Sequence, residues 1–392
     1  MPTRVVVIGG GFGGLTAACA LREAAGAGVE LLVVDASRTF LMGLRKLWLV
    51  DGRSTRAAGE RDRTRLAARG IPFRQGRVEG IDPMARRVRV DGEDLRYDFL
   101  VLASGAQPRP DLVPGMAAGR PDLFNLYDAA DAERLGARLR DLGEGRVVVA
   151  IAGLPYKCPP APYEAAFLID DLLRRTGRRQ RVELEVLSPQ PSSLPSAGQQ
   201  ACDAVEGELV ARGIRFRPRT VVEAVEDGRL MLASGERVVA DLVAVVPPHR
   251  PTPAVATTGL AGEGGWVRVD PATLATADER VFAVGDVVAL QTGAGLPFPK
   301  AGIFAERQGA VVGRNIAALL AGRSPSEAFD GYGYCFIEVG GGLATRVEGN
   351  FFTAPPQVRV VEPRPEHLQE KVAFERERLA RWFPDTAGAS GA

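Results

Sequence analysis

Two cysteines stand in sequence contexts that favour redox chemistry over simple packing. Cys158 follows Lys157, precedes Pro159 and Pro160, and comes shortly after an apolar run. A cysteine on a loop stiffened by prolines, with an ammonium beside it, is a candidate for a thiol of lowered pKa. Cys335 lies much later, in FDGYGYCFIEVGGG. The residues alone leave two interpretations open, a reactive pair or two unrelated free thiols.

The remaining residue types argue against several other chemistries. Neither His249 nor His367 lies near a serine or cysteine in a triad-like motif, so histidine-dependent hydrolysis is disfavoured. The cysteine spacings do not resemble a zinc site, and we expect no metal. Cys19 and Cys202 fall in helical stretches and are expected to pack. Of 49 basic residues only four are lysines, so a retained lysine such as Lys300 can be needed for its compact ammonium.

Length and composition indicate a globular protein of several domains. A chain of 392 residues is too long for one ordinary core, so two or three domains are expected. Its net charge of +1 gives no reason to expect a nucleic-acid partner. We see neither a leader sequence nor an apolar run of about 18–20 residues, and therefore expect a cytoplasmic location. Structural disulfides are rare there, so a disulfide would more often be catalytic.

The N-terminal region predicts a βαβ unit that binds a dinucleotide. Strands are expected at residues 4–9 and 29–35, with a helix opening in GGGFGGLTAACALREA between them. This loop has GxGxxG spacing, and an acid that can hold a ribose follows about 20 residues later. Such a loop brings a pyrophosphate to the N-terminus of the helix. The residues concerned are Gly9, Gly11, Gly14 and Asp35.

Two later segments extend this unit into a site for FAD. The strand within residues 97–108 ends at Ser104 and Gly105, and RVFAVGD ends at Gly285 and Asp286. In flavoproteins with two dinucleotide-binding units, the first segment returns beside FAD and the second holds its ribityl and pyrophosphate portion. We therefore predict an α/β fold with two Rossmann-like domains and a C-terminal segment. The FAD-binding domain is discontinuous and comprises residues 1–110 and 266–325.

Residues 111–265 predict a second Rossmann-like domain that lacks the chemistry of nicotinamide binding. Strands at 146–152 and 182–187 flank a helix around 162–176. The sequence GLPYKCPPAPYE stands where a glycine loop would be, and its prolines offer no N–H groups to a pyrophosphate. The second strand leads into Ser188 without a ribose-binding acid. We infer that NAD(P)H is not the partner of this domain.

The segments around these cysteines resemble those of a known family, the sulfide:quinone oxidoreductases and flavocytochrome c sulfide dehydrogenases. These belong to the disulfide-reductase-type flavoproteins. GLPYKCPPAPYEAAF is similar to their first redox-cysteine segment, which places the first cysteine at Cys158 and an acid at Glu164. The resemblance places the second cysteine at Cys335. The stretch from Lys300, continuing as FAERQGAVVGRNIA, is similar to the segment that opens a helix under the flavin.

The resemblance implies a reaction and a role for each of these residues. Hydrosulfide would attack a Cys158–Cys335 disulfide, and two electrons would pass through FAD to a quinone. Glu164 would accept a proton, unless it is merely a solvated acid of the first helical turn. Lys300 would stabilise negative charge on reduced flavin, unless it is a surface lysine. No cysteine stands near residues 40–44 or 124–127, where some members attach FAD, so noncovalent FAD is expected.

The C-terminal segment, residues 326–392, carries the second cysteine and an amphipathic helix. Its apolar face is expected to present Leu368, Val372, Leu379 and Trp382. Three contacts are open for this face: the inner surface of the plasma membrane, the protein itself, and a second subunit of a homodimer. Nearby aromatic residues would line a quinone pocket or pack in the core. These are Tyr332, Tyr334, Phe336, Phe351 and Phe352.

Three alternatives to sulfide oxidation remain open from the sequence. A flavin oxidoreductase of the same fold could act on another thiol, a persulfide or a small metabolite. A type II NADH dehydrogenase is related in fold, but the missing second glycine loop disfavours it. A non-catalytic FAD-binding or partner-binding protein is disfavoured by the cysteines.

Overall fold

A parallel sheet forms the core of one half of the molecule. The computed structural model describes residues 2–117 and 120–384. The central strand β1 pairs in parallel with β2 on one side and β9 on the other. Most residues of its five strands are apolar, as expected for a sheet that is covered on both faces. In spatial order they are β21 (Val281–Ala283), β9 (Phe99–Leu102), β1 (Thr3–Ile8), β2 (Val29–Asp35) and β5 (Phe73–Gln75).

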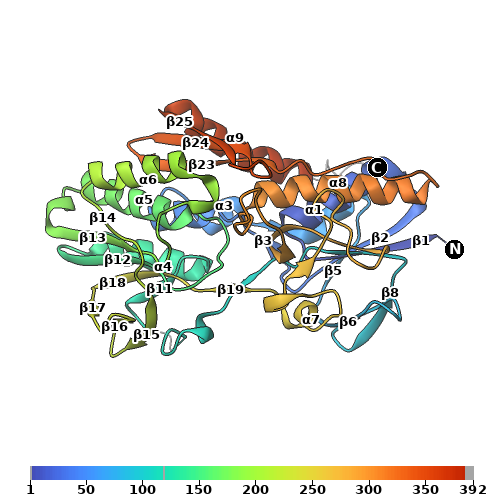
Figure 1. The fold of residues 1–392 in the computed structure, drawn as a ribbon, viewed down its shortest axis with the longest axis horizontal. Helices are drawn as coiled ribbons and strands as arrows, with labels where there is room; N and C mark the ends of the chain where they lie inside the picture. Colours follow the sequence, from blue (N-terminus) through green and yellow to red (C-terminus); the bar gives the residue numbers. More distant parts are fainter. Residues whose placement is uncertain (1, 118–119, 385–392) are drawn as a thin grey trace, which may run out of the picture.

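A second parallel sheet forms the core of the other half (Figure 1). Its central strand β12 pairs in parallel with β13 and β18. In spatial order the strands are β11 (Leu123–Asn125), β18 (Leu242–Val246), β12 (Gly145–Ile151), β13 (Val182–Leu187) and β14 (Arg215–Arg217). The prediction of an α/β fold with two Rossmann-like units is thereby confirmed. The strand positions agree with those expected to within a few residues.

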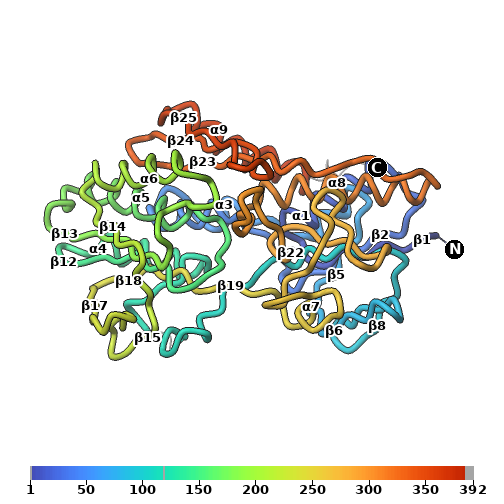
Figure 2. The backbone as a smooth tube through the Cα atoms, viewed as in Figure 1, coloured from blue at the N-terminus to red at the C-terminus, as the bar shows by residue number. Residues whose placement is uncertain are grey.

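The first sheet combines segments from both parts of the chain, as the blue and orange tubes of one half show (Figure 2). Strand β21 pairs with β9, although nearly the whole second sheet separates them in sequence. The two halves are linked by a short antiparallel pair, β10 (Gln107–Pro108) with β19 (His249–Arg250). The domain limits at 1–110, 266–325 and 111–265 remain our proposed division.

Two helices cover the first sheet and pack unusually closely against each other. They are α1 (Phe12–Ala25) and α8 (Gly302–Leu320). A Cβ atom on Gly309 would overlap the carbonyl oxygen of Gly13, and one on Gly313 would overlap that of Ala17. Glycine at these positions lets the two helix backbones touch. The contact fixes the start of α8 relative to the glycine loop that precedes α1.

The second sheet carries α4 (Ala129–Asp141), α5 (Ala161–Arg175) and α6 (Gln199–Ala211). The C-terminal part forms an antiparallel sheet of three strands with a long final helix. These are β23 (Tyr332–Gly340), β24 (Leu343–Asn350), β25 (Gln357–Arg364) and α9 (Pro365–Trp382). Figure 1 shows this unit lying along one side of both halves, next to α5 and α6 and reaching toward α1 and α8.

The remaining elements are short. Two three-stranded antiparallel sheets consist of β6 (Val78–Asp82), β7 (Arg87–Val90) and β8 (Glu93–Arg96), and of β15 (Val222–Glu226), β16 (Arg229–Leu232) and β17 (Arg237–Val239). Two further strand pairs are β3 (Thr39–Phe40) with β4 (Arg61–Asp62), and β20 (Val267–Arg268) with β22 (Val288–Ala289). Short helices are α2 (Arg45–Val50), α3 (Arg56–Gly59) and α7 (Pro253–Ala256). Among the residues that the structure describes, no helix combines the length and apolarity needed to traverse a bilayer.

Candidate active site

The loop between β12 and α5 presents Cys158 to the other half of the molecule. The backbone of Cys158 is left-handed, with φ of 51°, a conformation that costs a non-glycine residue energy. Its amide donates to the carbonyl oxygen of Lys300 at 2.5 Å. The carbonyl oxygen of Cys158 in turn accepts from the amide of Ala161, at the start of α5. The loop is therefore held between the starts of α5 and α8.

Strand β23 brings Cys335 to the same place. The two side chains are close enough that a hydrogen bond between the two thiols is the largest influence on the pKa of each. Both residues are half-buried and both are free thiols. The sequence resemblance pairs these cysteines, and the fold puts them in contact. Their redox role is part of the proposal made below.

The pKa values of the two thiols differ, and Cys335 rather than Cys158 is the more acidic thiol. The hydrogen bond from Cys335, followed by burial, raises the pKa of Cys158 well above its usual range. The hydrogen bond from Cys158 lowers the pKa of Cys335. The expectation that Lys157 acidifies Cys158 is wrong, because its ammonium points elsewhere. It donates to the carbonyl oxygen of Ala106 at 3.3 Å and lies 5.8 Å from the ring centre of Tyr127.

Glu164 lies in the first turn of α5, behind the cysteine pair. Its side chain is buried, so the alternative of a solvated acid is wrong. The carboxylate contacts the ammonium of Lys371, which is also buried and comes from α9. Burial raises the pKa of Glu164 to about 7, and the nearby charge of Lys371 opposes this rise. A carboxyl group that titrates near neutral pH is suited to exchanging protons.

A second buried carboxylate stands beside the first. Glu338 lies three residues after Cys335 on β23, and its Oε1 is 3.0 Å from Nζ of Lys371. The same carboxylate accepts from Nε1 of Trp48 at 2.6 Å and from Arg53 at 2.5 Å. Arg53 also pairs with Asp51. The network thus runs from the cysteine pair to Arg53, whose side chain is partly exposed.

The C-terminal helix α9 packs on the protein through charged residues as well as apolar ones. Its buried positions are His367, Lys371, Glu375, Leu379 and Trp382. Glu375 contacts Arg45, which anchors the helix to α2. The expected apolar face is only partly correct, because Val372 is exposed whereas Leu379 and Trp382 are buried. Helix α9 therefore places Lys371 at the site.

Lys300 precedes α8 and is held by main-chain oxygens. Its ammonium donates to the carbonyl oxygens of Asp286 at 2.9 Å and Val288 at 3.1 Å. It also lies 3.8 Å from the ring centre of Trp266, in cation–π geometry. Burial lowers the pKa of Lys300 to about 8. The alternative of an ordinary surface lysine is wrong, since the residue is half-buried and fixed in position.

The expected FAD residues form a cradle that fits a dinucleotide cofactor. A Cβ atom on Gly9 or Gly14 would overlap backbone, whereas one on Gly11 would meet no atom within 4 Å. Helix α1 therefore begins at a close-packed turn with open space in front of it and without a side-chain cap. Asp35 lies at the end of β2, where it accepts from the amide of Gly10 at 2.7 Å.

The second FAD segment leaves one buried hydroxyl without a partner, and the third makes a tight turn. The hydroxyl of Ser104 is buried and makes no hydrogen bond within the described residues. A Cβ atom on Gly105 would meet open space. Gly285 has φ of 78° and donates its amide to Gln308 of α8, which turns the chain at Asp286. Unpaired buried groups beside open space are what a cofactor with many acceptors would satisfy.

A cavity of about 1220 Å³ opens between the two halves and reaches Cys335. Cys335 lines it, as do Tyr156 and Pro159 on either side of Cys158. Lys300 and Trp266 also line it. The cavity is therefore large enough for a small sulfur compound to approach Cys335 and the neighbours of Cys158.

The five aromatic residues considered for a quinone pocket do not gather in one place. Only Tyr334 and Phe351 line the cavity. Phe351 and Phe352 belong to a ring cluster with Phe298, while Tyr334 packs against Phe336. Tyr332, Tyr334 and Phe336 share one face of β23, because every second residue of a strand points to the same side. Phe351 and Phe352 instead follow β24 and pack against Phe298, so the five residues do not form one pocket.

The loop after β12 is rich in proline, so it offers no long run of amides to a second dinucleotide. Three of its residues are prolines, and the amide of Cys158 is used by Lys300. In the same loop the carbonyl oxygen of Lys157 accepts from the hydroxyl of Tyr127 at 2.5 Å. The inference that this half does not bind NAD(P)H stays a prediction, and the prolines of this loop are its basis.

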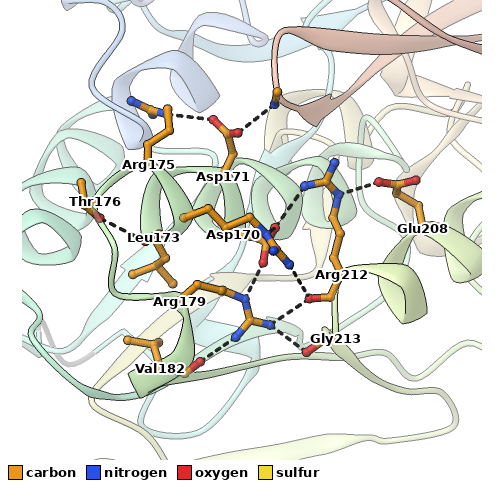
Figure 3. Close-up of polar contacts among 12 residues, drawn as sticks. Asp170, Asp171, Leu173, Arg175, Thr176, Arg179, Val182, Glu208, Arg212 and Gly213 are labelled. Carbon is orange, nitrogen blue, oxygen red and sulfur yellow. Dashed lines mark hydrogen bonds and ion pairs between the residues drawn. The ribbon is translucent and has the colours of Figure 1, made fainter.

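The far end of α5 is fixed by a buried carboxylate, which steadies Glu164 at the near end. Asp170 is fully buried and pairs with Arg174, Arg179 and Arg212. Figure 3 shows Arg179 and Arg212 converging on Asp170 from the loop after α5 and from the end of α6. The adjacent Asp171 accepts from the amide of Gly341 at 2.8 Å, which ties α5 to the C-terminal sheet.

Sequence reasoning missed Lys371, Glu338 and Arg53. One signal could have found the first, because lysine is rare in this chain and Lys371 is one of four. The other three lysines are also partly or fully buried around the site, at positions 46, 157 and 300. No sequence signal identifies Glu338 or Arg53. Cys19 and Cys202 are buried in α1 and α6, as expected for packing residues.

Comparisons with known proteins agree with this description. Residues 3–311 match the family described as pyridine nucleotide-disulphide oxidoreductase. Over 365 residues the chain is 24% identical to the mitochondrial sulfide:quinone oxidoreductase of Mus musculus, covering 90% of this chain and 79% of the relative. It is 30% identical over 306 residues to the NADH dehydrogenase-like protein Rv1812c of Mycobacterium tuberculosis, covering 73% of each.

A solved structure shows the same fold over nearly the whole chain. The sulfide:quinone oxidoreductase of Aquifex aeolicus has a TM-score of 0.86 at 23% identity, covering 99% of this chain and 93% of that chain. The family match, which covers most of the chain, agrees with the glycine cradle and the two parallel sheets. The chain therefore belongs to the pyridine nucleotide-disulphide oxidoreductase family, and is an FAD-dependent oxidoreductase similar to the sulfide:quinone oxidoreductases.

Proposed function

We propose that this enzyme oxidises sulfide through Cys158 and Cys335 and passes two electrons by way of FAD to a quinone. The observation that carries the proposal is the contact between these two thiols, with their pKa values shifted in opposite directions. Similarity to sulfide:quinone oxidoreductases supports the substrate and the acceptor.

The unequal acidity of the two thiols indicates the direction of the reaction. In thiol–disulfide exchange the sulfur of lower pKa leaves faster. Hydrosulfide therefore attacks the sulfur of Cys158, the disulfide bond breaks, and Cys335 leaves as a thiolate. The new sulfur–sulfur bond makes Cys158 a persulfide. No metal is needed for this exchange.

Glu164 supplies the proton acceptor and Lys300 the fixed positive charge. When hydrogen sulfide rather than hydrosulfide enters, the carboxylate of Glu164 takes up the proton that is released. Residues that would hold FAD are Gly9, Gly11, Gly14, Asp35, Ser104, Gly105, Gly285, Asp286 and Lys300. A second hydrosulfide would remove the outer sulfur of the Cys158 persulfide as HSS⁻ and a proton, leaving two cysteine thiolates. When bound, noncovalently on this proposal, FAD would accept the two electrons that these thiolates release as the disulfide forms again. The ammonium of Lys300 is fixed by two carbonyl oxygens. Its positive charge is therefore preorganised to stabilise negative charge on reduced flavin.

A second candidate function is favoured by one specific observation, the similarity to an NADH dehydrogenase-like protein. The proline-rich loop after β12 opposes it, because the loop offers no row of amides to a pyrophosphate. The proposed activity further implies a quinone dissolved in a membrane. Peripheral association with the inner face of the plasma membrane, from a cytoplasmic location, would give access to it. A homodimer is compatible with this arrangement.

An anaerobic titration separates the candidates. Purified FAD-loaded protein is mixed with sulfide or with NADH, and flavin absorbance is followed. We expect rapid bleaching by sulfide, slow or no bleaching by NADH, and reoxidation by decylubiquinone. Bleaching by NADH alone would replace this proposal with the dehydrogenase function. Bleaching by an organic persulfide but not by sulfide would assign a different sulfur substrate to the same cysteines.

A further inference from the structure

The ion pair between Glu164 and Lys371 has an unusual environment. Both side chains are buried, with exposed fractions of 3% each. Taking a carboxylate and an ammonium out of water costs several kcal/mol each, and a buried pair returns this only with further polar partners. Glu338 is one such partner, since its Oε1 lies 3.0 Å from Nζ of Lys371. Lys371 therefore stands between the carboxylates of Glu164 and Glu338. Only Glu164 depends on the Lys371 ammonium to balance its negative charge.

The second carboxylate has its own compensation. Glu338 accepts from Trp48 at 2.6 Å and from Arg53 at 2.5 Å, so it remains charged without exclusive use of Lys371. Glu164 contacts no cation other than Lys371 among the described residues. Loss of the ammonium would leave Glu164 buried and unpaired, whereas loss of the Glu338 charge would leave Lys371 entirely to Glu164.

The network adjoins the cysteine pair from two sides. Glu338 is on the same strand as Cys335, and Glu164 is on the helix that begins after Cys158. The charges of Glu164 and Lys371 act on both thiols in opposite senses, the carboxylate raising and the ammonium lowering their pKa values. Any change in the protonation of Glu164 is therefore transmitted to the thiols.

We propose that Lys371 and Glu338 are positioning residues that act through Glu164. Lys371 keeps the Glu164 carboxylate charged and fixed behind the cysteine pair, whereas the negative charge of Glu338 favours protonation of Glu164. Together Lys371 and Glu338 set the pH above which Glu164 can accept a proton. This inference rests on the proposed function for its catalytic meaning. It assigns to the C-terminal helix α9 a part in proton exchange at a site formed by other elements.

The titratable groups around Glu164 can be named from each element that packs on α5. The C-terminal helix contributes Lys371, and β23 contributes Glu338 and Cys335. The segment after α2 contributes Arg53, and the loop before α5 contributes Cys158. Other charged groups of these elements are engaged elsewhere. They include Arg45 with Glu375, Lys46 with the carbonyl oxygen of Tyr127, Asp51 with Arg53, and Asp170 with three arginines. Strand β13, which also packs on α5, carries the buried Glu185, and this carboxylate pairs with Arg146 at 2.6 Å.

We expect two substitutions to shift the titration midpoint of Glu164 in opposite directions. A merely structural role of Lys371 and Glu338 would not produce opposite shifts. Lys371→Met removes the ammonium and retains the length of the side chain, so protonation of Glu164 becomes easier. Its titration midpoint rises from about 7 by about 1–3 pH units. Glu338→Gln removes the opposing charge and retains an acceptor for Trp48, so the midpoint falls by about one unit. Glu164→Gln removes the titration.

The direct test is an infrared pH titration of the oxidised FAD-loaded protein, following the carbonyl stretch of a protonated buried carboxyl group. Glu164→Gln identifies the band. A rise in Lys371→Met together with a fall in Glu338→Gln supports the inference. Shifts of the same sign in both variants, or none in either, overturn it. If Lys371→Met does not fold, Glu338→Gln decides alone: a downward shift supports the inference, and any other result overturns it.

A kinetic test links the network to the reaction. The rate of flavin reduction by sulfide is measured against pH for native protein and both variants. The acid limb of the profile moves upward in Lys371→Met and downward in Glu338→Gln, by the same amounts as the infrared midpoints. Native protein that is not reduced by sulfide at any pH contradicts the proposed function, while the infrared titration still decides this inference. An acid limb that stays fixed while the infrared midpoints move overturns the coupling of Glu164 to the thiols.

Discussion

The carbonyl oxygen of Lys300 accepts a hydrogen bond from the backbone amide of Cys158 at 2.5 Å. This one contact joins the loop of the second sheet to the segment just before α8 in the other half. The first cysteine and the start of the helix beside the FAD cradle are therefore fixed relative to each other by main-chain atoms. Side-chain substitutions at either residue can test chemistry without removing this link.

Loss of either thiol should abolish sulfide-driven flavin reduction. We expect Cys158→Ser and Cys335→Ser each to lower the rate on the order of 10³-fold or more, because residues that act as one unit fail together. The double variant should be no slower than either single one. Stopped-flow absorbance measures the rate. Cys202→Ser is the matched control, since this buried thiol contacts the hydroxyl of Ser192 and lies in α6; turnover at the native rate in Cys158→Ser would contradict the disulfide mechanism.

The more acidic thiol should be alkylated first. In dithiothreitol-reduced protein, Cys335 should react with iodoacetamide before Cys158 at every pH below the pKa of Cys158. The thiolate is the nucleophile, and the pKa of Cys335 is lowered whereas that of Cys158 is raised. Labelling of Cys335 should rise with pH and level off above its pKa. Peptide mass spectrometry reports the site, and buried Cys19, with its pKa raised to about 11, is the unlabelled reference.

Removing the buried charge at the far end of α5 should destabilise the second half of the molecule. Asp170→Asn leaves three arginines without their shared carboxylate, which should lower the free energy of unfolding by about 3 kcal/mol. Urea unfolding followed by circular dichroism measures the change. Asp111→Asn serves as control, because its pair with Arg109 is solvent-exposed and should contribute nothing measurable. Equal stability of the two variants would show that the Asp170 cluster is not a stabilising anchor.

Adding a methyl group between α1 and α8 should weaken FAD retention. In Gly313→Ala the new Cβ would overlap the carbonyl oxygen of Ala17, so the helices must separate, at a cost of about 1–3 kcal/mol. Because α1 and α8 both begin at the cradle, we expect a lower ratio of bound FAD to protein after gel filtration. Gly207→Ala in α6 is the control, since its Cβ would meet no atom within 4 Å and helix propensity favours alanine by about 1 kcal/mol. Full FAD occupancy in Gly313→Ala would argue that the helix contact does not position the cradle.

The sequence by itself determined the fold class and the position of the local motifs. The glycine spacing around Gly11, the alternation of apolar strands with helices, and the proline-rich loop at Cys158 are all local patterns. Each reflects a conformation that the residues themselves favour, such as the tight turn before α1. For the same reason the expected strand at 29–35 coincides with β2.

Only the tertiary structure decided how distant residues act on one another. Cys158 was expected to be the acidic thiol because Lys157 is its neighbour in sequence, yet the lysine points away and Cys335 receives the acidifying hydrogen bond. The pairing of Glu164 with Lys371 joins residues more than two hundred positions apart. Charges interact through space, and burial depends on which elements pack together, so neither the acidity of a thiol nor the neutrality of a buried carboxylate can be read from the order of residues.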